Sequence, residues 1–147
     1  MKIHEGLWRN YMDDQEFITQ FEAGALPAES FHHQDHVRMA WLYLDRAPVL
    51  EALVNFAESL KRFAAANGKP GLYHETITWA YIFLINERRA RFDRQHTWHE
   101  FAAANADLLD WRNGILRQYY RAETLSSALA RRVFVMPDQT AGRSQAD

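Results

Sequence analysis

The feature that most constrains this fold is the spacing of the apolar residues, which recur every three to four positions along most of the chain. The segments from about Phe31 to Arg46 and from about Val49 to Ala66 both show this period, which is typical of amphipathic helices. A further segment, from about Tyr73 to Arg91, is apolar on nearly every side and indicates a buried helix. No segment alternates apolar and polar residues as a half-buried strand does. The sequence therefore predicts an all-α fold.

Helix start and stop signals divide the remaining chain. Asp13-x-x-Glu16 and Thr97-x-x-Glu100 resemble capping boxes, and Gly24 is placed to end the first helix. Ser30 is the expected N-cap of the helix over about 31–46. We expect a link over 107–111, a short helix over 113–120, and a last helix ending near 132 with Thr124 or Ser126 as its cap. The prediction is one domain over residues 1–147, a bundle of five to seven helices, with residues 1–12 as an N-terminal arm and 137–147 as a flexible tail.

Composition excludes several classes of protein. With no cysteine, the chain has neither a disulfide framework nor a thiolate zinc site. A formal charge of −2 provides no basic surface, so we expect no nucleic-acid partner. The longest apolar run, near 79–85, is far shorter than the ~20 residues of a membrane span, and the start of the chain lacks a signal-peptide core. We therefore expect a cytoplasmic protein that does not enter a membrane, and the sequence leaves a homodimer open.

Two clusters of histidine and carboxylate begin two of the predicted helices. His32, His33, Asp35 and His36 open the helix over about 31–46, and His74 and Glu75 open the helix over about 73–91. The spacing of His32 and His36 is i, i+4 and that of His33 and His36 is i, i+3, so either pair can direct two imidazoles from one helical face. On the same helical projection, His36 faces the core.

Imidazole and carboxylate are the ligands that Zn, Fe, Mn and Ni accept in proteins. We therefore predict a divalent-metal site with His33, His36, His74 and Glu75 as ligands, and with Glu75 and His36 as the catalytic residues. Metal-bound water with a pKa near 7 would allow hydrolysis or transfer on a small organic substrate, and the same ligands suit Fe(II) oxygen chemistry. Asp35, His32, Thr78 and Tyr43 are expected around these ligands, with Asp35 orienting a ligand imidazole.

The same residues allow a reading without metal. His36 and Glu75 would then form an acid–base pair in which the carboxylate sets the imidazole tautomer. In the alternative from another class, the histidines are structural, and the chain is a non-catalytic module that binds a small molecule or another protein.

The motifs Phe31-x-His33-x-Asp35-His36 and Tyr73-His74-Glu75-Thr76-Ile77-Thr78 resemble those of a group of small bacterial helical proteins without an established activity. This resemblance extends from about residue 13 to the segment 133–138 and favours His33 over His32 as the functional residue. In architecture the chain also resembles the DinB/YfiT helical bundles, which hold a divalent metal with three histidines, although the order of the motifs differs.

Overall fold

The computed structural model describes residues 13–139, and the predicted N-terminal arm (1–12) and most of the predicted tail (140–147) lie outside this range. Within it the chain forms eight α-helices and no β-strand, which confirms the all-α class. Five of these helices have seven or more residues, in agreement with the predicted five to seven. Across the same residues, no helix combines the length and the apolar composition that a membrane span requires.

The chain divides into two compact units, the first ending at Tyr73 and the second beginning at His74. The prediction of one domain over all 147 residues stays a prediction. The first unit contains α2 (Asp14–Glu22), α3 (His33–Arg46) and α4 (Val49–Ala66), with 3-10 turns at Ala28–Ser30 and Pro70–Leu72. The second contains α5 (Glu75–Ala90), α6 (Trp98–Ala104), α7 (Ala106–Leu109), α8 (Ala122–Leu125) and α9 (Ala128–Arg132), with a 3-10 turn at Ile115–Gln118.

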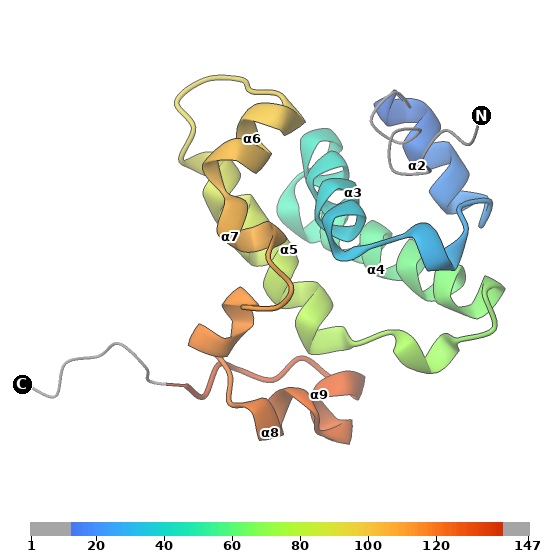
Figure 1. The fold of residues 1–147 in the computed structure, drawn as a ribbon, viewed down its shortest axis with the longest axis vertical. Coiled ribbons are helices and arrows are strands. Elements are labelled where there is room, and N and C mark those ends of the chain that lie inside the picture. Colours follow the sequence, from blue (N-terminus) through green and yellow to red (C-terminus); the bar gives the residue numbers. More distant parts are fainter. Residues whose placement is uncertain (1–12, 140–147) are drawn as a thin grey trace, which may run out of the picture. The chain divides into compact units, whose positions relative to one another are not determined.

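In the first unit, α2, α3 and α4 all pack against one another (Figure 1). Aromatic rings fill the space between them: the ring of Phe21 lies 5.4 Å from that of Phe31 and 5.3 Å from that of Phe63. Gly24 ends α2 with a φ of +68°, and a Cβ there would meet the Cβ of Ala66 at 3.4 Å. Glycine suits this position because it accepts a positive φ and leaves room for the end of α4.

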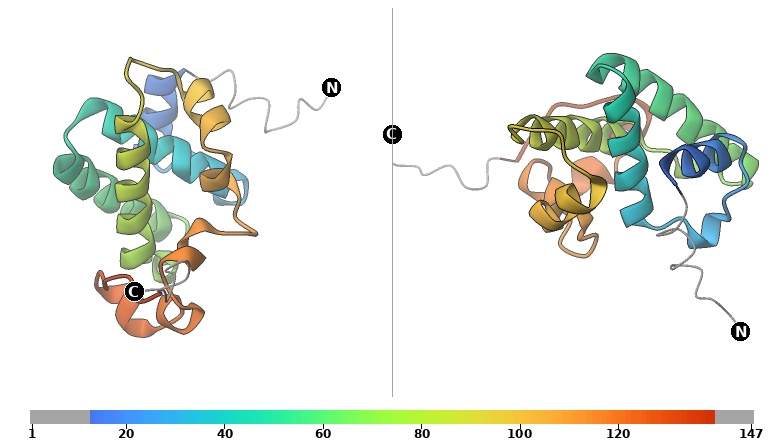
Figure 2. Two further views of the ribbon diagram at one scale, coloured as in Figure 1. Left: turned by 90° about the vertical axis from the view of Figure 1, so that its left-hand side faces the viewer. Right: turned by 90° about the horizontal axis from the view of Figure 1, so that it is seen from above.

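In the second unit, α8 and α9 lie at the end of α5 where that helix begins (Figure 2). The short elements differ from the sequence prediction. Helix α7 occupies part of the predicted link over 107–111, a 3-10 turn replaces the predicted helix over 113–120, and the last helix is capped by Ser127, not by Thr124 or Ser126. Propensity alone does not determine such short turns, because packing decides them.

The described start of the predicted flexible tail is held in place. The carboxylate of Asp138 accepts hydrogen bonds from the backbone N–H of Arg121, at 2.9 Å, and from the hydroxyl of Thr124. The backbone N–H groups of Asp138 and Gln139 donate to the carbonyl of Tyr119 at 3.0 and 2.9 Å. Asp138 and Gln139 are therefore held against the second unit by the Asp138 carboxylate and by backbone hydrogen bonds, which the composition of the tail does not reveal.

Candidate functional site

The first turn of α3 begins two residues later than predicted. His32, not Ser30, is the N-cap, and its backbone N–H donates to the carboxylate of Asp35 at 2.9 Å. Ser30 is buried instead, with its hydroxyl donating to the carbonyl of Pro27 at 3.1 Å. The carboxylate predicted to orient a ligand imidazole thus closes the first turn of its own helix.

His36 lies against the aromatic core of the first unit. Its ring centroid is 4.3 Å from that of Phe31, and the two rings are inclined by 43°. Burial, with a smaller contribution from the neighbouring His33, lowers the pKa of His36 to about 4. His36 is therefore a neutral imidazole at neutral pH, with a lone pair on one ring nitrogen. Within residues 13–139 no hydrogen bond to either of its ring nitrogens is formed.

Tyr43, two turns beyond His36 on α3, belongs to a separate polar cluster. Its hydroxyl donates to the carboxylate of Glu22 at 2.7 Å and lies 3.0 Å from the hydroxyl of Ser59. Arg62 donates to that same serine oxygen at 3.1 Å. Burial raises the pKa of Tyr43, so its hydroxyl stays protonated and joins α2, α3 and α4. The sequence did not indicate Ser59, which is a buried serine on an otherwise apolar face of α4.

His74, the N-cap of α5, is buried, and both of its ring nitrogens are engaged. Nδ1 accepts a hydrogen bond from the backbone N–H of Ile77 at 3.2 Å, and Nε2 lies 2.7 Å from the backbone carbonyl of Leu125. Because Nδ1 accepts, Nε2 carries the proton and donates it to Leu125. The ring is therefore a neutral imidazole with one defined tautomer, joining α5 to α8.

Glu75 and Thr78, the other predicted site residues at the start of α5, form hydrogen bonds with residues of the same helix or its N-cap. The carboxylate of Glu75 accepts a hydrogen bond from the indole N–H of Trp79 at 2.9 Å, between residues one turn apart. Thr78 is buried, and its backbone N–H donates to the carbonyl of His74 in the first turn of the helix. Glu75 thus holds the Trp79 ring in place.

Thr76 is the residue of this turn that the sequence analysis missed. Its side chain is fully buried, with Oγ1 2.7 Å from the carbonyl oxygen of Ala130 and 2.9 Å from that of Val133. The same oxygen accepts a hydrogen bond from the backbone N–H of Val135 at 3.1 Å. The only signal in the sequence was a threonine in the first turn of an apolar helix, which does not reveal partners more than fifty residues away.

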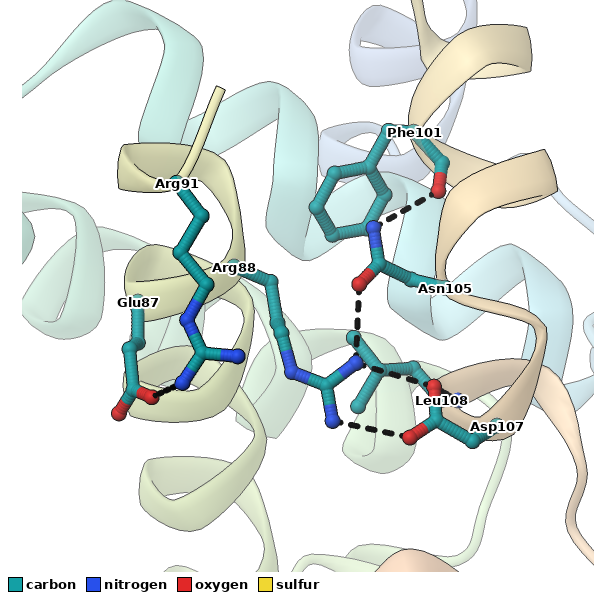
Figure 3. A network of polar contacts seen from close by, with 7 residues as sticks. All are labelled: Glu87, Arg88, Arg91, Phe101, Asn105, Asp107 and Leu108. Carbon is teal, nitrogen blue, oxygen red and sulfur yellow. Dashed lines mark hydrogen bonds and ion pairs between the residues drawn. The ribbon is translucent and has the colours of Figure 1, made fainter. Parts of the chain in front are cut away.

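Two arginines at the end of α5, Arg88 and Arg91, form hydrogen bonds and ion pairs with neighbouring side chains (Figure 3). The guanidinium of Arg88 donates to both carboxylate oxygens of Asp107, at 3.0 and 2.9 Å, and to the side-chain oxygen of Asn105 at 2.9 Å. The hydrogen bond from Arg88 is the largest reason that the pKa of Asp107 is lowered. Arg91 pairs with Glu87. Arg88 therefore joins α5 to α7, whereas Arg91 pairs with a residue one turn earlier along the chain, in α5 (Figure 3).

The four predicted metal ligands differ in how well their surroundings suit the binding of a metal ion. Among the described residues, no group of three or more His, Cys, Asp or Glu side chains is placed to hold a metal ion. His33 and His36 belong to the first unit, and His74 and Glu75 to the second. His36 has the chemistry of a ligand, being neutral, with His33 three positions before it. His74 does not fit in its present state, because both ring nitrogens are committed to backbone groups.

The chain matches no protein-family model, no curated protein and no solved structure. The resemblance of the motifs to those of small bacterial helical proteins, and the resemblance in architecture to the DinB/YfiT bundles, therefore stay predictions.

Proposed function

We propose that the protein is a divalent-metal-dependent enzyme that acts on a small organic substrate, with His33 and His36 as imidazole ligands at the start of α3. The observation that carries this proposal is the state of His36, a neutral imidazole whose ring nitrogens form no hydrogen bond within residues 13–139. A lone pair on a neutral ring is what a metal ligand or a general base must offer. His74 and Glu75, which the sequence predicts as further ligands, belong to the second unit.

The class of metal follows from the donors. Imidazole and carboxylate suit Zn, Fe, Mn or Ni, and a bound ion of this kind would supply an activated water or an open position for oxygen chemistry. In this proposal His33 and His36 hold the ion. The sequence also predicts a role for Glu75, as a ligand or as the general base, and the Glu75→Gln variant tests that prediction. It should keep its metal content and lose about 10²–10⁴-fold in turnover if Glu75 is the base, and lose metal affinity if Glu75 is a ligand.

The test is metal analysis of protein purified without an affinity tag. We expect one equivalent of a divalent metal in the parent chain, a loss of that metal in His36→Ala, and no loss in His99→Ala. His99 is a suitable control because it is an exposed histidine of α6. A parent chain that purifies without metal and shows no change in melting temperature with added Zn²⁺, Mn²⁺, Ni²⁺ or Fe²⁺ would contradict the proposal.

A second candidate is a non-catalytic module that binds a small molecule or a protein and whose histidines are structural. The hydrogen bonding of His74 favours it, because one histidine already serves as a helix cap and as a link to α8. In this case His36→Ala and His74→Ala should change stability without changing metal content. The same purification and melting experiments therefore decide between the two candidates.

A further inference from the structure

The chain contains two Asn-Gly pairs, Asn67 with Gly68 and Asn113 with Gly114. An asparagine followed by glycine is prone to spontaneous deamidation, because the glycine has no Cβ to hinder its backbone nitrogen. That nitrogen attacks the side-chain carbonyl carbon of the asparagine and ammonia leaves. Water then opens the cyclic imide to aspartate or to isoaspartate. The sequence makes the two pairs equally reactive, so any difference between them comes from the fold.

The first pair, at the end of α4, has a hydrogen bond on each of the two reacting groups. The side-chain N–H of Asn67 donates to the carbonyl of Phe63 at 2.8 Å, and the backbone N–H of Gly68 donates to that of Ala65 at 3.0 Å. The φ of Gly68 is +72°, so the backbone itself requires glycine there. Attack needs the Gly68 nitrogen to lose its proton and the Asn67 side chain to turn toward it. Both hydrogen bonds therefore oppose the reaction.

The second pair, in the turn after α7, is held less firmly. Asn113 is exposed, and the backbone N–H of Gly114 forms no hydrogen bond within residues 13–139. The side-chain nitrogen of Asn113 lies 3.4 Å from Oδ2 of Asp110, which is longer than an ordinary N–H···O hydrogen bond. Both reacting groups of this pair are therefore accessible.

We propose that Asn113 is a site of spontaneous conversion to aspartate and isoaspartate, and that the conversion opens the turn that Asp110 closes. The bond from the Gly114 nitrogen to Cγ of Asn113 forms, and the bond from Cγ to Nδ2 breaks. The ammonia that leaves carries away the proton of the Gly114 nitrogen. One water molecule then hydrolyses the imide and leaves a new carboxylate at this position. The inference does not depend on the proposed metal-dependent function.

The new carboxylate would face the one that holds this turn. Oδ1 of Asp110 accepts hydrogen bonds from the backbone N–H groups of Arg112 and Asn113, at 3.1 and 3.2 Å. Conversion replaces the N–H group near Oδ2 with an oxygen, so two like charges oppose each other, and isoaspartate also lengthens the backbone. Because the buried residues Ile115 and Leu116 follow directly, we expect the loosening to extend over residues 110–118.

The first experiment is incubation of the full chain at mildly alkaline pH. Peptide mass spectrometry then counts the mass gain of the amide-to-acid conversion at each asparagine and identifies isoaspartate by its fragmentation. Since two hydrogen bonds oppose the reaction at Asn67, we expect Asn113 to convert about thirtyfold faster. In guanidinium chloride the two rates should become similar, because glycine follows both residues. Conversion of Asn113 no faster than that of Asn67 in the folded chain would overturn the proposal.

A variant of Gly114 tests the nucleophile. Its φ is −53°, and a Cβ there would meet only the carbonyl oxygen of Trp111, at 3.5 Å, so the fold accepts alanine. Gly114→Ala should melt as the parent chain does. Over the time in which half of the parent converts, it should lose the mass gain at Asn113 and keep the slow conversion of Asn67. Conversion of Asn113 at the parent rate would overturn the assignment of the Gly114 nitrogen.

A second variant tests the opening of the turn. Asn113→Asp introduces the carboxylate directly, and Asn113→Gln is the matched control that keeps an uncharged amide. For two exposed like charges we expect amide hydrogen exchange about two- to fivefold faster over residues 110–118 in Asn113→Asp than in Asn113→Gln, and equal exchange over α4. Equal exchange of the two variants over residues 110–118 would overturn the opening of the turn.

Discussion

The first turns of α3 and α5 are alike in sequence and different in structure. Both helices have a histidine as N-cap, His32 for α3 and His74 for α5, and both carry a carboxylate in the first turn. The His32 side chain is exposed, whereas His74 is buried with both ring nitrogens in hydrogen bonds. On α3, the histidine whose ring packs against the aromatic core is His36, one turn after His32, and its ring contacts that of Phe31.

The difference shows that the neighbours of a histidine, more than its place in a helix, decide its use. Leu125 supplies a backbone carbonyl to His74, and an imidazole with both nitrogens hydrogen-bonded is a structural element. Phe31 supplies His36 with an apolar ring and no hydrogen-bond partner, so the imidazole is kept neutral and its nitrogens are not committed within residues 13–139. Four substitutions or conditions test this contrast.

The largest expected effect is at Thr76, which the sequence analysis missed. Thr76→Val keeps the shape of the side chain but leaves buried backbone groups of Ala130, Val133 and Val135 without a partner. Because each buried group left unsatisfied costs about 1–3 kcal/mol, we expect the free energy of unfolding to fall by about 3 kcal/mol in urea denaturation. Thr78→Val is the control, since no side-chain hydrogen bond of Thr78 is formed within residues 13–139. Equal losses in both variants would contradict the role given to Thr76.

The second effect contrasts the two histidines directly. His74→Ala removes a helix cap and the bond to Leu125, each contributing about 1 kcal/mol, so the free energy of unfolding should fall by about 2 kcal/mol at pH 8. His36→Ala removes only ring packing on Phe31 and should cost less than about 1 kcal/mol at that pH. If His36→Ala is the more destabilising of the two, His36 is the structural histidine and the contrast is reversed.

The third test uses pH. Burial lowers the pKa of His36 to about 4 in the folded protein, against 6.5 for an unperturbed histidine. The unfolded chain therefore takes up a proton between these values that the folded chain does not, and stability is lost as the pH falls below about 6.5. Between pH 8 and pH 5, the parent chain should lose about 2 kcal/mol more than His36→Gln. Parallel stability curves for the two proteins would show that His36 is not held neutral.

The smallest expected change in stability is at Glu75. Glutamine keeps an oxygen acceptor for the indole N–H of Trp79, so Glu75→Gln loses only the favourable charge in the first turn of α5, about 0.3–1 kcal/mol. Glu75→Ala should lose the Trp79 hydrogen bond as well and melt at a lower temperature than Glu75→Gln. Identical melting temperatures for the two variants would show that the bond to Trp79 does not contribute.

Local signals predicted much of the helical framework. Asp13 caps α2, Thr97 caps α6, and α4 has the predicted bounds, Val49 to Ala66. Each of these depends on interactions within one turn or on a period within one helix, which neighbouring residues determine. The prediction that Ser30 caps α3 was wrong, because the same local rule also allows His32 with Asp35, and burial of Ser30 against the Pro27 carbonyl decides between them.

The sequence by itself determined that the described chain is helical, where its long helices lie, and which two turns carry histidine and carboxylate. These properties follow from periodicity and capping, which act over a few residues. Only the tertiary structure decided that His74 is tied to Leu125, that Thr76 holds residues 130–135, and that His36 is neutral against Phe31. Those outcomes depend on backbone groups and on burial that other segments of the chain supply. Because every residue has a carbonyl oxygen, the sequence does not indicate which carbonyl will accept a hydrogen bond, and only its position in the folded chain selects it.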